Sequence, residues 1–409
     1  IFFIIFGNIK LIMPVLSEKG GNLPASPIRK LVQFADQAKA RGTYVYHLNI
    51  GQPDIDAPKE SLEVIQNSNL KLLPYGASEG SLSFRKSLCT YFAKNKIAVD
   101  PQDIIVTSGA SEAVAFTFNC IADVGDEIII PEPFYANYSG FAAASNINVI
   151  PVISLFEDQF CLPPIESIEA KITSRTKAIL ICNPSNPTGY LYSKEEIEKL
   201  GDLAIKHNIF LIIDEVYREF IHDDETKHYS VLESRKLVDH AIMIDSVSKR
   251  YSLCGARVGC LVSKNKALIA NALKFAHLRL SPATYALLAS EAAINSDSSY
   301  LLAVKKEYTA RKKTLISSLE KIDGVRVSNP KGAFYCIVEL PVDDAEIFSK
   351  WMLTDFTDNN ETVMFAPAAG FYSSPGYGKK QIRIGFVLNE QKLLRATEIL
   401  EKALKTYSN

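Results

Sequence analysis

Residues 246–260 of this chain read SVSKRYSLCGARVGC, and this stretch does most to decide the fold. It places Lys249 three residues after Ser246 and eight before Arg257. A lysine amine can bind an aldehyde covalently while a serine hydroxyl and an arginine hold a phosphate. Pyridoxal 5'-phosphate (PLP) carries both groups on one ring, so the stretch favours a PLP site. The alternative is a serine-rich surface turn with scattered basic residues.

The composition is that of an ordinary soluble globular protein. The chain has 409 residues, of which 47% are hydrophobic and 22% charged, which is enough for a large core and two lobes. Lys+Arg is 45 and Asp+Glu is 46, so the net charge of -1 argues against nucleic acid or a membrane as a partner. Seven cysteines without a C-x-x-C pair predict neither a disulfide framework nor a metal site, and favour the cytoplasm.

The N-terminal stretch Ile1–Phe6 is strongly apolar but too short to span a membrane. No basic residue precedes it, as one would in a signal peptide. Met13 has the character of a natural start. We therefore expect residues 1–12 to be translated upstream sequence outside the fold, with a truncated targeting segment as the alternative.

Short apolar runs alternate with amphipathic segments through the middle of the chain. The predicted strands are apolar nearly throughout, as expected of strands covered on both faces: Ile104–Thr107, Glu127–Ile130, Val149–Ile153, Ala178–Cys182, Phe210–Asp214, Ala241–Asp245 and Gly259–Val262. Alternating strands and helices predict a doubly wound, mostly parallel α/β sheet. Its ligand should lie beyond the carboxyl ends of the strands.

Two helices have recognisable starts. Ser193 stands three residues before Glu196, which is capping-box spacing, and an apolar face follows at Ile197, Leu200 and Ala204. Ser26 followed by Pro27 predicts a second helix start. The apolar stripe of that helix would be Leu31, Phe34, Ala35 and Ala38, with Gly42 ending it.

The C-terminal third predicts a smaller α/β domain. Charged helices surround a few strands there, and helical spacing recurs at Leu393, Ala396, Ile399, Leu400 and Ala403. We expect residues 13–55 to form an N-terminal segment packed with this domain. Residues 56–290 would form the large PLP-binding domain and residues 291–409 the small one.

Chemically capable residues follow two of the predicted strands. Ser108-Gly109-Ala110-Ser111 lies between a strand and a helix, where free N–H groups could hold a phosphate, although glycine there can also serve geometry alone. Asp214 ends another strand and could pair with a protonated pyridine nitrogen, with Tyr217 near the same ring. The alternative for Asp214 is a helix N-cap.

Four further residues complete the set of candidates. Asn186 lies between two proline-rigidified turns that could aim its amide into a cleft, and Tyr135 follows a Pro-Glu-Pro turn from which it could stack on a planar ring. Gly51 follows a strand where backbone could approach a ligand. Arg383 lies opposite the apolar face of its strand and could bind a carboxylate. The alternative for Asn186 is a plain loop connection, that for Tyr135 is packing in the core, and that for Arg383 is exposure to solvent.

Together these residues resemble the class I aminotransferases of the fold type I PLP-dependent enzymes, and within them the bacterial aspartate aminotransferases. The match runs from about Pro14 to the C-terminus. It implies that Lys249 binds the PLP aldehyde and that Asp214 pairs with the ring nitrogen. Its other implied cofactor contacts are Tyr217 and Asn186 to the ring oxygen, Ser246, Arg257, Gly109 and Ala110 to the phosphate, and Tyr135 stacked on the ring.

The resemblance also implies substrate contacts and a partner. Arg383 would bind the α-carboxylate beside Gly51 and Asn186. Tyr75 would reach the phosphate of a neighbouring subunit, which implies a homodimer. Lys249 would then move the α-proton during transfer of an amino group from an L-amino acid, with aspartate the best guess, to 2-oxoglutarate by a ping-pong mechanism.

Specificity is the point at which the sequence departs from the family pattern. Ser111 stands where one bacterial branch has a lysine for the distal carboxylate, and Arg279 could supply that charge or be a surface residue. Alanine, aromatic or broad amino-acid use therefore stays open. So does a PLP-dependent C–S β-lyase, whereas a non-catalytic PLP-binding regulator would need a DNA-binding segment ahead of this domain.

Overall fold

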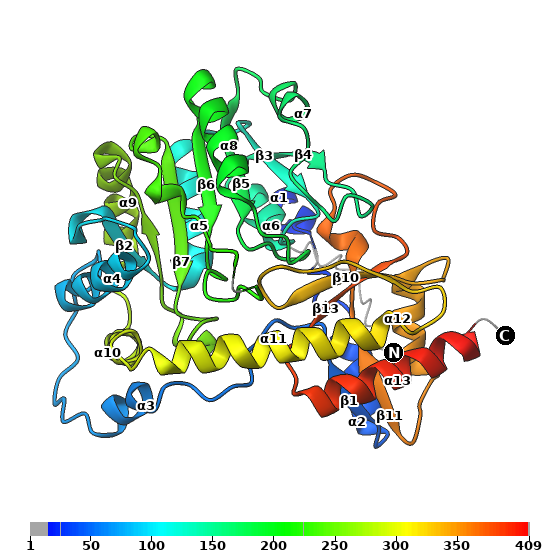
Figure 1. The fold of residues 1–409 in the computed structure, drawn as a ribbon. Helices are drawn as coiled ribbons and strands as arrows, with labels where there is room; N and C mark the ends of the chain where they lie inside the picture. Colours follow the sequence, from blue (N-terminus) through cyan, green and yellow to red (C-terminus); the bar gives the residue numbers. More distant parts are fainter. Residues whose placement is uncertain (1–14, 25, 224, 408–409) are drawn as a thin grey trace, which may run out of the picture.

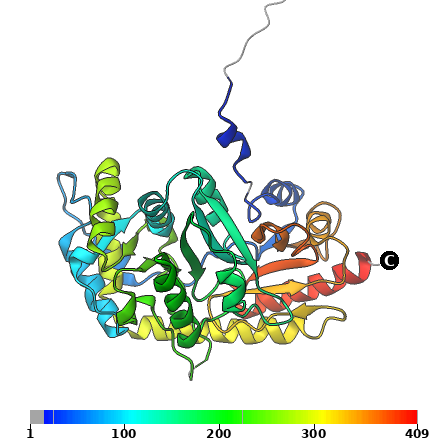
Figure 2. The ribbon, with the colours of Figure 1, turned by 90° about the horizontal axis from the view of Figure 1, so that it is seen from above.

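The computed structural model describes residues 15–24, 26–223 and 225–407, arranged as a larger and a smaller part (Figure 1). The larger part is built around a twisted sheet, and the smaller part holds the C-terminal strands and helices, coloured orange to red (Figure 2). A long helix, α11 (Ser299–Leu319), runs alongside both. The expectation for residues 1–12 lies outside the described residues.

The large sheet is mostly parallel, as predicted. Its strands are β2 (Ile104–Thr107), β3 (Glu127–Glu132), β4 (Asn148–Ile153), β5 (Thr176–Cys182), β6 (Phe210–Asp214), β7 (Ala241–Ser246) and β8 (Gly259–Val262). They lie in the order β2-β8-β7-β6-β5-β3-β4, and β8 runs antiparallel to both of its neighbours. The start of β8 therefore lies at the same edge of the sheet as the carboxyl ends of the other strands.

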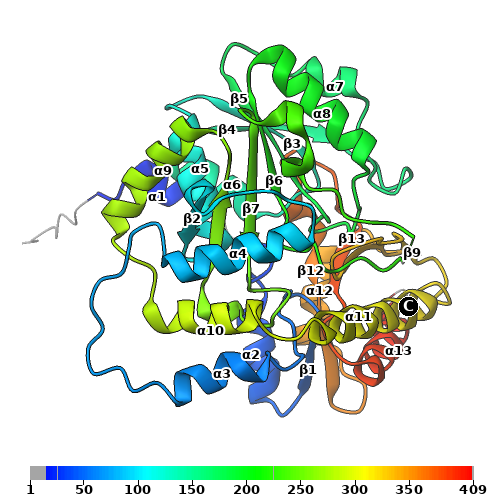
Figure 3. The same ribbon diagram turned by 60° about the vertical axis from the view of Figure 1, so that its left-hand side comes forward.

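Helices cover both faces of this sheet, which explains the continuous apolar strands. Ile179 and Ile181 face one side, with α4 (Leu82–Lys94), α8 (Lys194–His207) and α10 (Thr284–Ile294) packed on it (Figure 3). Ala178 and Leu180 face the other, with α5 (Gly109–Ile121), α6 (Asn137–Ala144) and α9 (Lys266–Arg279). The remaining helices of the larger part are α3 (Lys59–Gln66), which packs on α10, and α7 (Ile165–Glu169), which packs on α8.

Helix α8 begins with the predicted capping box. The Ser193 hydroxyl accepts a hydrogen bond from the backbone N–H of Glu196 at 3.1 Å, and the Glu196 carboxylate accepts one from the N–H of Ser193 at 2.7 Å. Ile197, Leu200 and Ala204 are buried, as the apolar spacing predicted. Local hydrogen bonding and the buried stripe therefore agree on where this helix starts and which face it buries.

The helix predicted to start at Ser26 and Pro27 begins later, so that prediction was wrong. Helix α2 spans Val32–Ala40, and the residues before it form turns in which the Ser26 carbonyl accepts from the N–H groups of Arg29 and Lys30. Pro27 packs tightly on Gly370, and this tertiary contact holds the segment out of the helix. The helix does end before Gly42, which has φ +87°.

The smaller part contains two short sheets. One has the order β12 (Ala366–Pro367), β13 (Gln381–Gly385), β10 (Tyr335–Glu339) and β9 (Arg326–Val327), and in the other β1 (Tyr44–His47) pairs in parallel with β11 (Glu361–Met364). The helices here are α12 (Ala345–Thr354) and α13 (Glu390–Tyr407). The short helices elsewhere are α1 (Glu18–Asn22), η1 (Pro101–Asp103), η2 (Val231–Glu233), η3 (Arg235–Leu237), η4 (Cys254–Ala256) and η5 (Ala368–Phe371).

The N-terminal segment packs against the C-terminal part of the chain. Strand β1 pairs with β11, and α2 packs on α12. The apolar residues predicted for the last helix are all buried in α13: Leu393, Ala396, Ile399, Leu400 and Ala403. The boundaries at residues 55/56 and 290/291 stay a prediction.

Candidate active site

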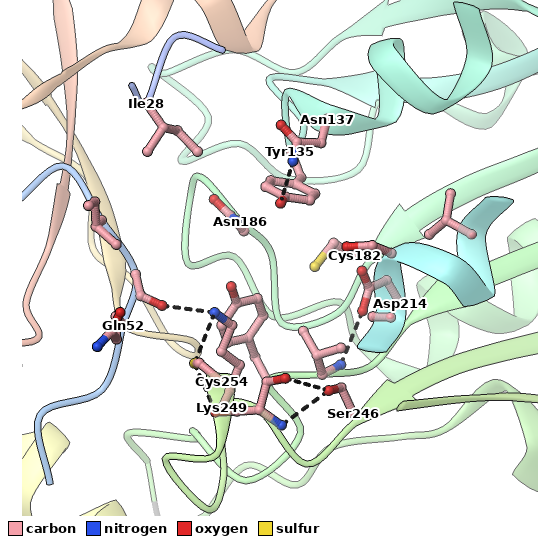
Figure 4. A pocket seen from close by; sticks show the side chains of 18 of the residues that line it. Ile28, Gln52, Tyr135, Asn137, Cys182, Asn186, Asp214, Ser246, Lys249 and Cys254 are labelled. Atoms are coloured by element: carbon pink, nitrogen blue, oxygen red, sulfur yellow. Dashed lines mark hydrogen bonds between the residues drawn. The ribbon is translucent and has the colours of Figure 1, made fainter. Parts of the chain in front are cut away.

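A cavity of about 650 Å³ opens at the carboxyl edge of the large sheet. Its walls come from residues 26–29, the loop at residues 50–52, the start of α5, the ends of β5 and β6, the loop 246–257, and the smaller part through Tyr335 and Arg383. This is the edge at which an open α/β sheet is expected to bind its ligand. Figure 4 shows side chains from these elements converging on the cavity.

Lys249 lies in this cavity with its amine held by backbone. Its Nζ donates a hydrogen bond to the carbonyl oxygen of Gly51 at 2.8 Å and lies 3.9 Å from the Sγ of Cys254 (Figure 4). Burial lowers the pKa of Lys249, and the positive charges of Arg383 and Arg257 act in the same direction. An amine that loses its proton more readily is a better nucleophile near neutral pH.

Asp214 ends β6 and points into the cavity. Its carboxylate accepts hydrogen bonds from the Tyr138 hydroxyl at 2.8 Å and from the N–H of Val216 at 3.2 Å. Burial raises the pKa of Asp214 to about 6, although both hydrogen bonds oppose the shift. The residues that follow form a turn, so Asp214 caps no helix here. A buried carboxylate of this kind suits a cationic ligand atom.

The predicted phosphate-binding residues meet at one end of the cavity. Gly109 begins α5 with φ +75°, and a Cβ on it would lie 2.9 Å from the Cζ of Arg257. Ala110 follows in the first helical turn, whose N–H groups have no acceptor within the helix. Ser246 and Ser248 share a hydrogen bond of 2.8 Å between their hydroxyls. Helix N-terminus, hydroxyls and guanidinium together make an anion site.

Arg383 is buried, with only 1% of its surface exposed. This excludes the alternative of a solvent-exposed arginine. Its Nη1 donates to the Oδ1 of Asn186 at 2.9 Å, and its Nη2 donates to the carbonyl oxygen of Asn49. Among the described residues its Nε has no partner. The guanidinium lies over the rings of Tyr335 and Phe371, with centroid distances of 4.4 and 4.9 Å. Donors left over on a buried guanidinium fit a carboxylate ligand.

Two aromatic candidates also line the cavity. The hydroxyl of Tyr217 lies 3.0 Å from that of Tyr335, within hydrogen-bond distance. The hydroxyl of Tyr135 accepts from the Asn137 amide at 2.8 Å, and burial raises the pKa of Tyr135. Tyr135 contacts Tyr138 edge to face at 5.3 Å, so its ring is held as part of the cavity wall.

Tyr75 lies outside the cavity of its own chain. Its side chain is 82% exposed, in a segment that also exposes Leu70, Leu72 and Leu73. This placement is compatible with a contact to a second copy of the chain, as the resemblance implied.

Arg279 also lies away from the cavity. Its guanidinium donates to the carbonyl oxygens of Ser78 at 3.2 Å and Val106 at 2.9 Å, and lies 3.4 Å from Glu112. Ser111 does line the cavity but carries no charge. Arg279 therefore does not line the cavity of its own chain, and the hypothesis that it supplies the missing cation stays a prediction.

A buried cluster of charged side chains lies next to Lys249, and the sequence reasoning missed it. Arg250 follows Lys249 directly and donates to both carboxylate oxygens of Asp245, at 2.8 and 2.6 Å. Arg218 lies on the same carboxylate at 3.4 Å. The two guanidinium groups hold the pKa of Asp245 low, against the effect of burial. The sequence offered a hint only in the adjacent Lys-Arg pair.

The residues of the cavity fit PLP. A close glycine turn with Arg257 and serine hydroxyls suits its phosphate, Lys249 suits its aldehyde, and Asp214 suits its ring nitrogen. Ser246 reaches the carbonyl oxygen of Val258 at 2.8 Å, which fixes its hydroxyl at the phosphate end.

The described ranges contain no group of three or more His, Cys, Asp or Glu side chains placed to hold a metal ion. Within the same ranges, every helix is too short or too polar to cross a membrane. The cysteines are free.

Comparison with known proteins identifies an aminotransferase family. The family model described as aminotransferase class I and II matches residues 43–400. The chain is 29% identical to the aspartate aminotransferase of Pyrococcus horikoshii over 396 residues, covering 95% of this chain and 97% of that protein.

Two solved structures have nearly the same fold. One is an alanine aminotransferase from Pyrococcus furiosus, with a TM-score of 0.88, 28% identity and coverage of 96% of this chain and 100% of that one. The other is the aspartate aminotransferase of Thermus thermophilus with maleate, with a TM-score of 0.87, 25% identity and the same coverage.

Proposed function

The chain belongs to the class I and II aminotransferases, which depend on PLP, and from that premise we propose that it moves the amino group of L-aspartate to 2-oxoglutarate. The observation that carries the proposal is the placement of Lys249, which lines one cavity together with the buried Asp214 and Arg383. Relatives named aspartate aminotransferase, similar over nearly the whole chain, support aspartate as the donor.

Under this proposal PLP supplies an aldehyde that takes up an amino group and a ring that accepts the electrons released at the α-carbon. Lys249 holds the aldehyde when no substrate is present. Asp214 holds a proton on the ring nitrogen by its negative charge. Ser246, Arg257 and the N–H groups of the first turn of α5 bind the phosphate, which fixes the ring in one place.

Arg383 binds the α-carboxylate of the substrate through the donors that Asn186 and Asn49 leave free. The amine of Lys249, once released, takes the α-proton at Nζ and returns a proton during formation of the oxo acid. Its lowered pKa favours the neutral base that this step needs. The same residues serve the second half of the reaction in reverse, so the two substrates alternate in one site and ping-pong kinetics follow.

Alanine is a second candidate donor. Ser111, which lines the cavity, offers no charge to a distal carboxylate, and a structural neighbour of this chain is named alanine aminotransferase. A C–S β-lyase on the same scaffold would use Lys249 for elimination. The single-turnover measurement distinguishes this reaction from amino-group transfer.

We also propose that the protein works as a homodimer with Tyr75 reaching the neighbouring site. The exposed phenol and the apolar leucines beside it support this, because such a surface is stabilised by a second copy. A fully active monomer at assay concentration, measured by sedimentation alongside activity, would contradict the shared site.

The test is a single-turnover measurement on the PLP-loaded protein. It is mixed in turn with aspartate, glutamate, alanine, phenylalanine and cystathionine, with no oxo acid present. We expect one equivalent of oxaloacetate from aspartate, with further product only after 2-oxoglutarate is added. A faster reaction with alanine would transfer the proposal to that donor. Continuous release of pyruvate over many turnovers would identify a lyase and overturn it.

A further inference from the structure

The cavity has more cations than its cofactor and one carboxylate require. Among the described residues it is lined by Arg29, Lys249, Arg257 and Arg383, against the carboxylate of Asp214. Lys249, Arg257 and Arg383 each donate hydrogen bonds within the chain. The side chain of Arg29 makes no hydrogen bond or ion pair with any described residue, and it is exposed at the cavity wall. Its guanidinium is therefore free for a ligand.

The backbone holds Arg29 close to the substrate end of the cavity. The buried Asn49 donates from Nδ2 to the carbonyl oxygen of Ile28 at 2.8 Å, and its own carbonyl oxygen accepts from Arg383. Arg29 thus lies one residue from a hydrogen bond that leads to Arg383. Figure 4 shows Ile28 on the same side of the cavity as Tyr135. The charges of Arg383, Arg257 and Arg29 all lower the pKa of Tyr135 against the effect of burial, so Arg29 acts on the same space.

We propose that Arg29 binds the distal carboxylate of a dicarboxylic substrate, an inference that rests on the proposed function and names its substrate class. Arg257 is assigned to the phosphate and Arg383 to the α-carboxylate, while Ser111 brings no charge. A guanidinium presents paired donors that match a carboxylate. Arg29 makes four-carbon and five-carbon dicarboxylates preferred over monocarboxylates of similar size.

The test compares equilibrium binding of two inert acids of equal carbon number, succinate and butyrate, to the PLP-loaded protein by titration calorimetry. Arg29→Gln is expected to weaken succinate binding about tenfold more than butyrate binding, since a hydrogen bond to a charged group is lost at a site that water reaches. Arg29→Lys should restore part of the difference through its point charge. High salt should narrow the difference in the wild type.

Lys30→Gln is the matched control. It removes one positive charge from the next residue, which pairs with Glu346 outside the cavity, and should leave the succinate preference as in the wild type. The ratio of kcat/KM for aspartate to that for alanine, measured on the same variants, should fall about tenfold in Arg29→Gln alone.

Equal loss for both acids, no loss, or a wild type without a succinate preference would overturn the inference. Thermal melting of Arg29→Gln, expected at the wild-type temperature because the side chain is exposed, shows that any loss is local. The two proposals fail separately. A wild type that yields pyruvate continuously would overturn the aminotransferase reaction, while the succinate and butyrate titrations still decide the role of Arg29.

Discussion

Replacing Arg383 by lysine is expected to weaken binding of the substrate α-carboxylate by about 10- to 150-fold. The guanidinium uses Nη1 for Asn186 and Nη2 for Asn49, so each of these nitrogens keeps one N–H, and Nε keeps its own. A carboxylate can accept two of them in parallel, whereas a lysine offers a single point contact. Losing one hydrogen bond to a charged group costs about 1.5–3 kcal/mol, and each 1.4 kcal/mol corresponds to tenfold in affinity.

The assay is a titration of the PLP-loaded protein with aspartate, followed through the visible absorbance of the cofactor. Arg383→Ala removes both hydrogen bonds and should weaken binding by more than Arg383→Lys does. Cofactor content and melting temperature are measured in parallel, because Arg383 is buried and its removal takes a donor from the carbonyl oxygen of Asn49 and from the Oδ1 of Asn186. Folded, PLP-loaded Arg383→Ala with wild-type affinity for aspartate would show that the carboxylate binds elsewhere.

The remaining predictions concern the cofactor. Lys249→Ala should show no borohydride-stable link between protein and PLP, and an adduct found at another lysine by peptide mapping would refute the assignment. Burial raises the pKa of Asp214 to about 6, so the carboxylate is charged above that pH and protonated below it. The wild type should therefore bind PLP more tightly than Asp214→Asn by a constant factor well above pH 6, and this factor should shrink towards one below pH 6. A factor that does not change with pH would contradict the pairing of Asp214 with the ring nitrogen. Gly109→Ala should weaken binding of PLP about tenfold, because the new Cβ meets Arg257 at a positive φ. Gly42→Ala, which also has a positive φ but open space around it and lies outside the cavity, should bind PLP as the wild type does.

Much of the large sheet was predictable because its strands are covered on both faces. A strand such as β6 (Phe210–Asp214) is apolar at successive positions up to its last residue, and the prediction matches its bounds. The ends of β3 and β5 were less well predicted. β3 continues through Pro131 to Glu132, and a proline near a strand end reads as a turn in the sequence.

The late start of α2 shows what local sequence leaves out. Ser26 followed by Pro27 is a good helix start. However, Pro27 packs on Gly370, and the side-chain amide of Asn49 donates a hydrogen bond to the carbonyl oxygen of Ile28. Both partners are distant in the sequence. Tertiary contacts thus override local preference here, and they do so in the segment that carries Arg29 to the cavity.

The candidate site divides in the same way. Residues at strand ends, such as Asp214 and Ser246, could be predicted because the sheet brings carboxyl ends to one edge. The tie from Asn49 to Arg383 and the Tyr138 hydroxyl on Asp214 join residues from distant parts of the chain, and no spacing rule reveals them. The chemical roles of these residues stay predictions until the variants are measured.

The pairing of β7 with β8 fixes both ends of the loop that carries Lys249, residues 247–258. Ser246 ends β7 and lies directly opposite Gly259, the first residue of β8, so residues 247–258 leave the sheet and return to it at one fixed pair. A Cβ on Gly259 would lie 2.6 Å from the backbone nitrogen of Ala110, which keeps that position a glycine. The loop thus has both ends fixed to the sheet, and Arg250 within it pairs with the buried Asp245 of β7, so the loop and the sheet share a buried ion pair. A graft of this loop from a relative would be joined at Ser246 and Gly259, and it would have to keep Arg250 for the carboxylate of Asp245.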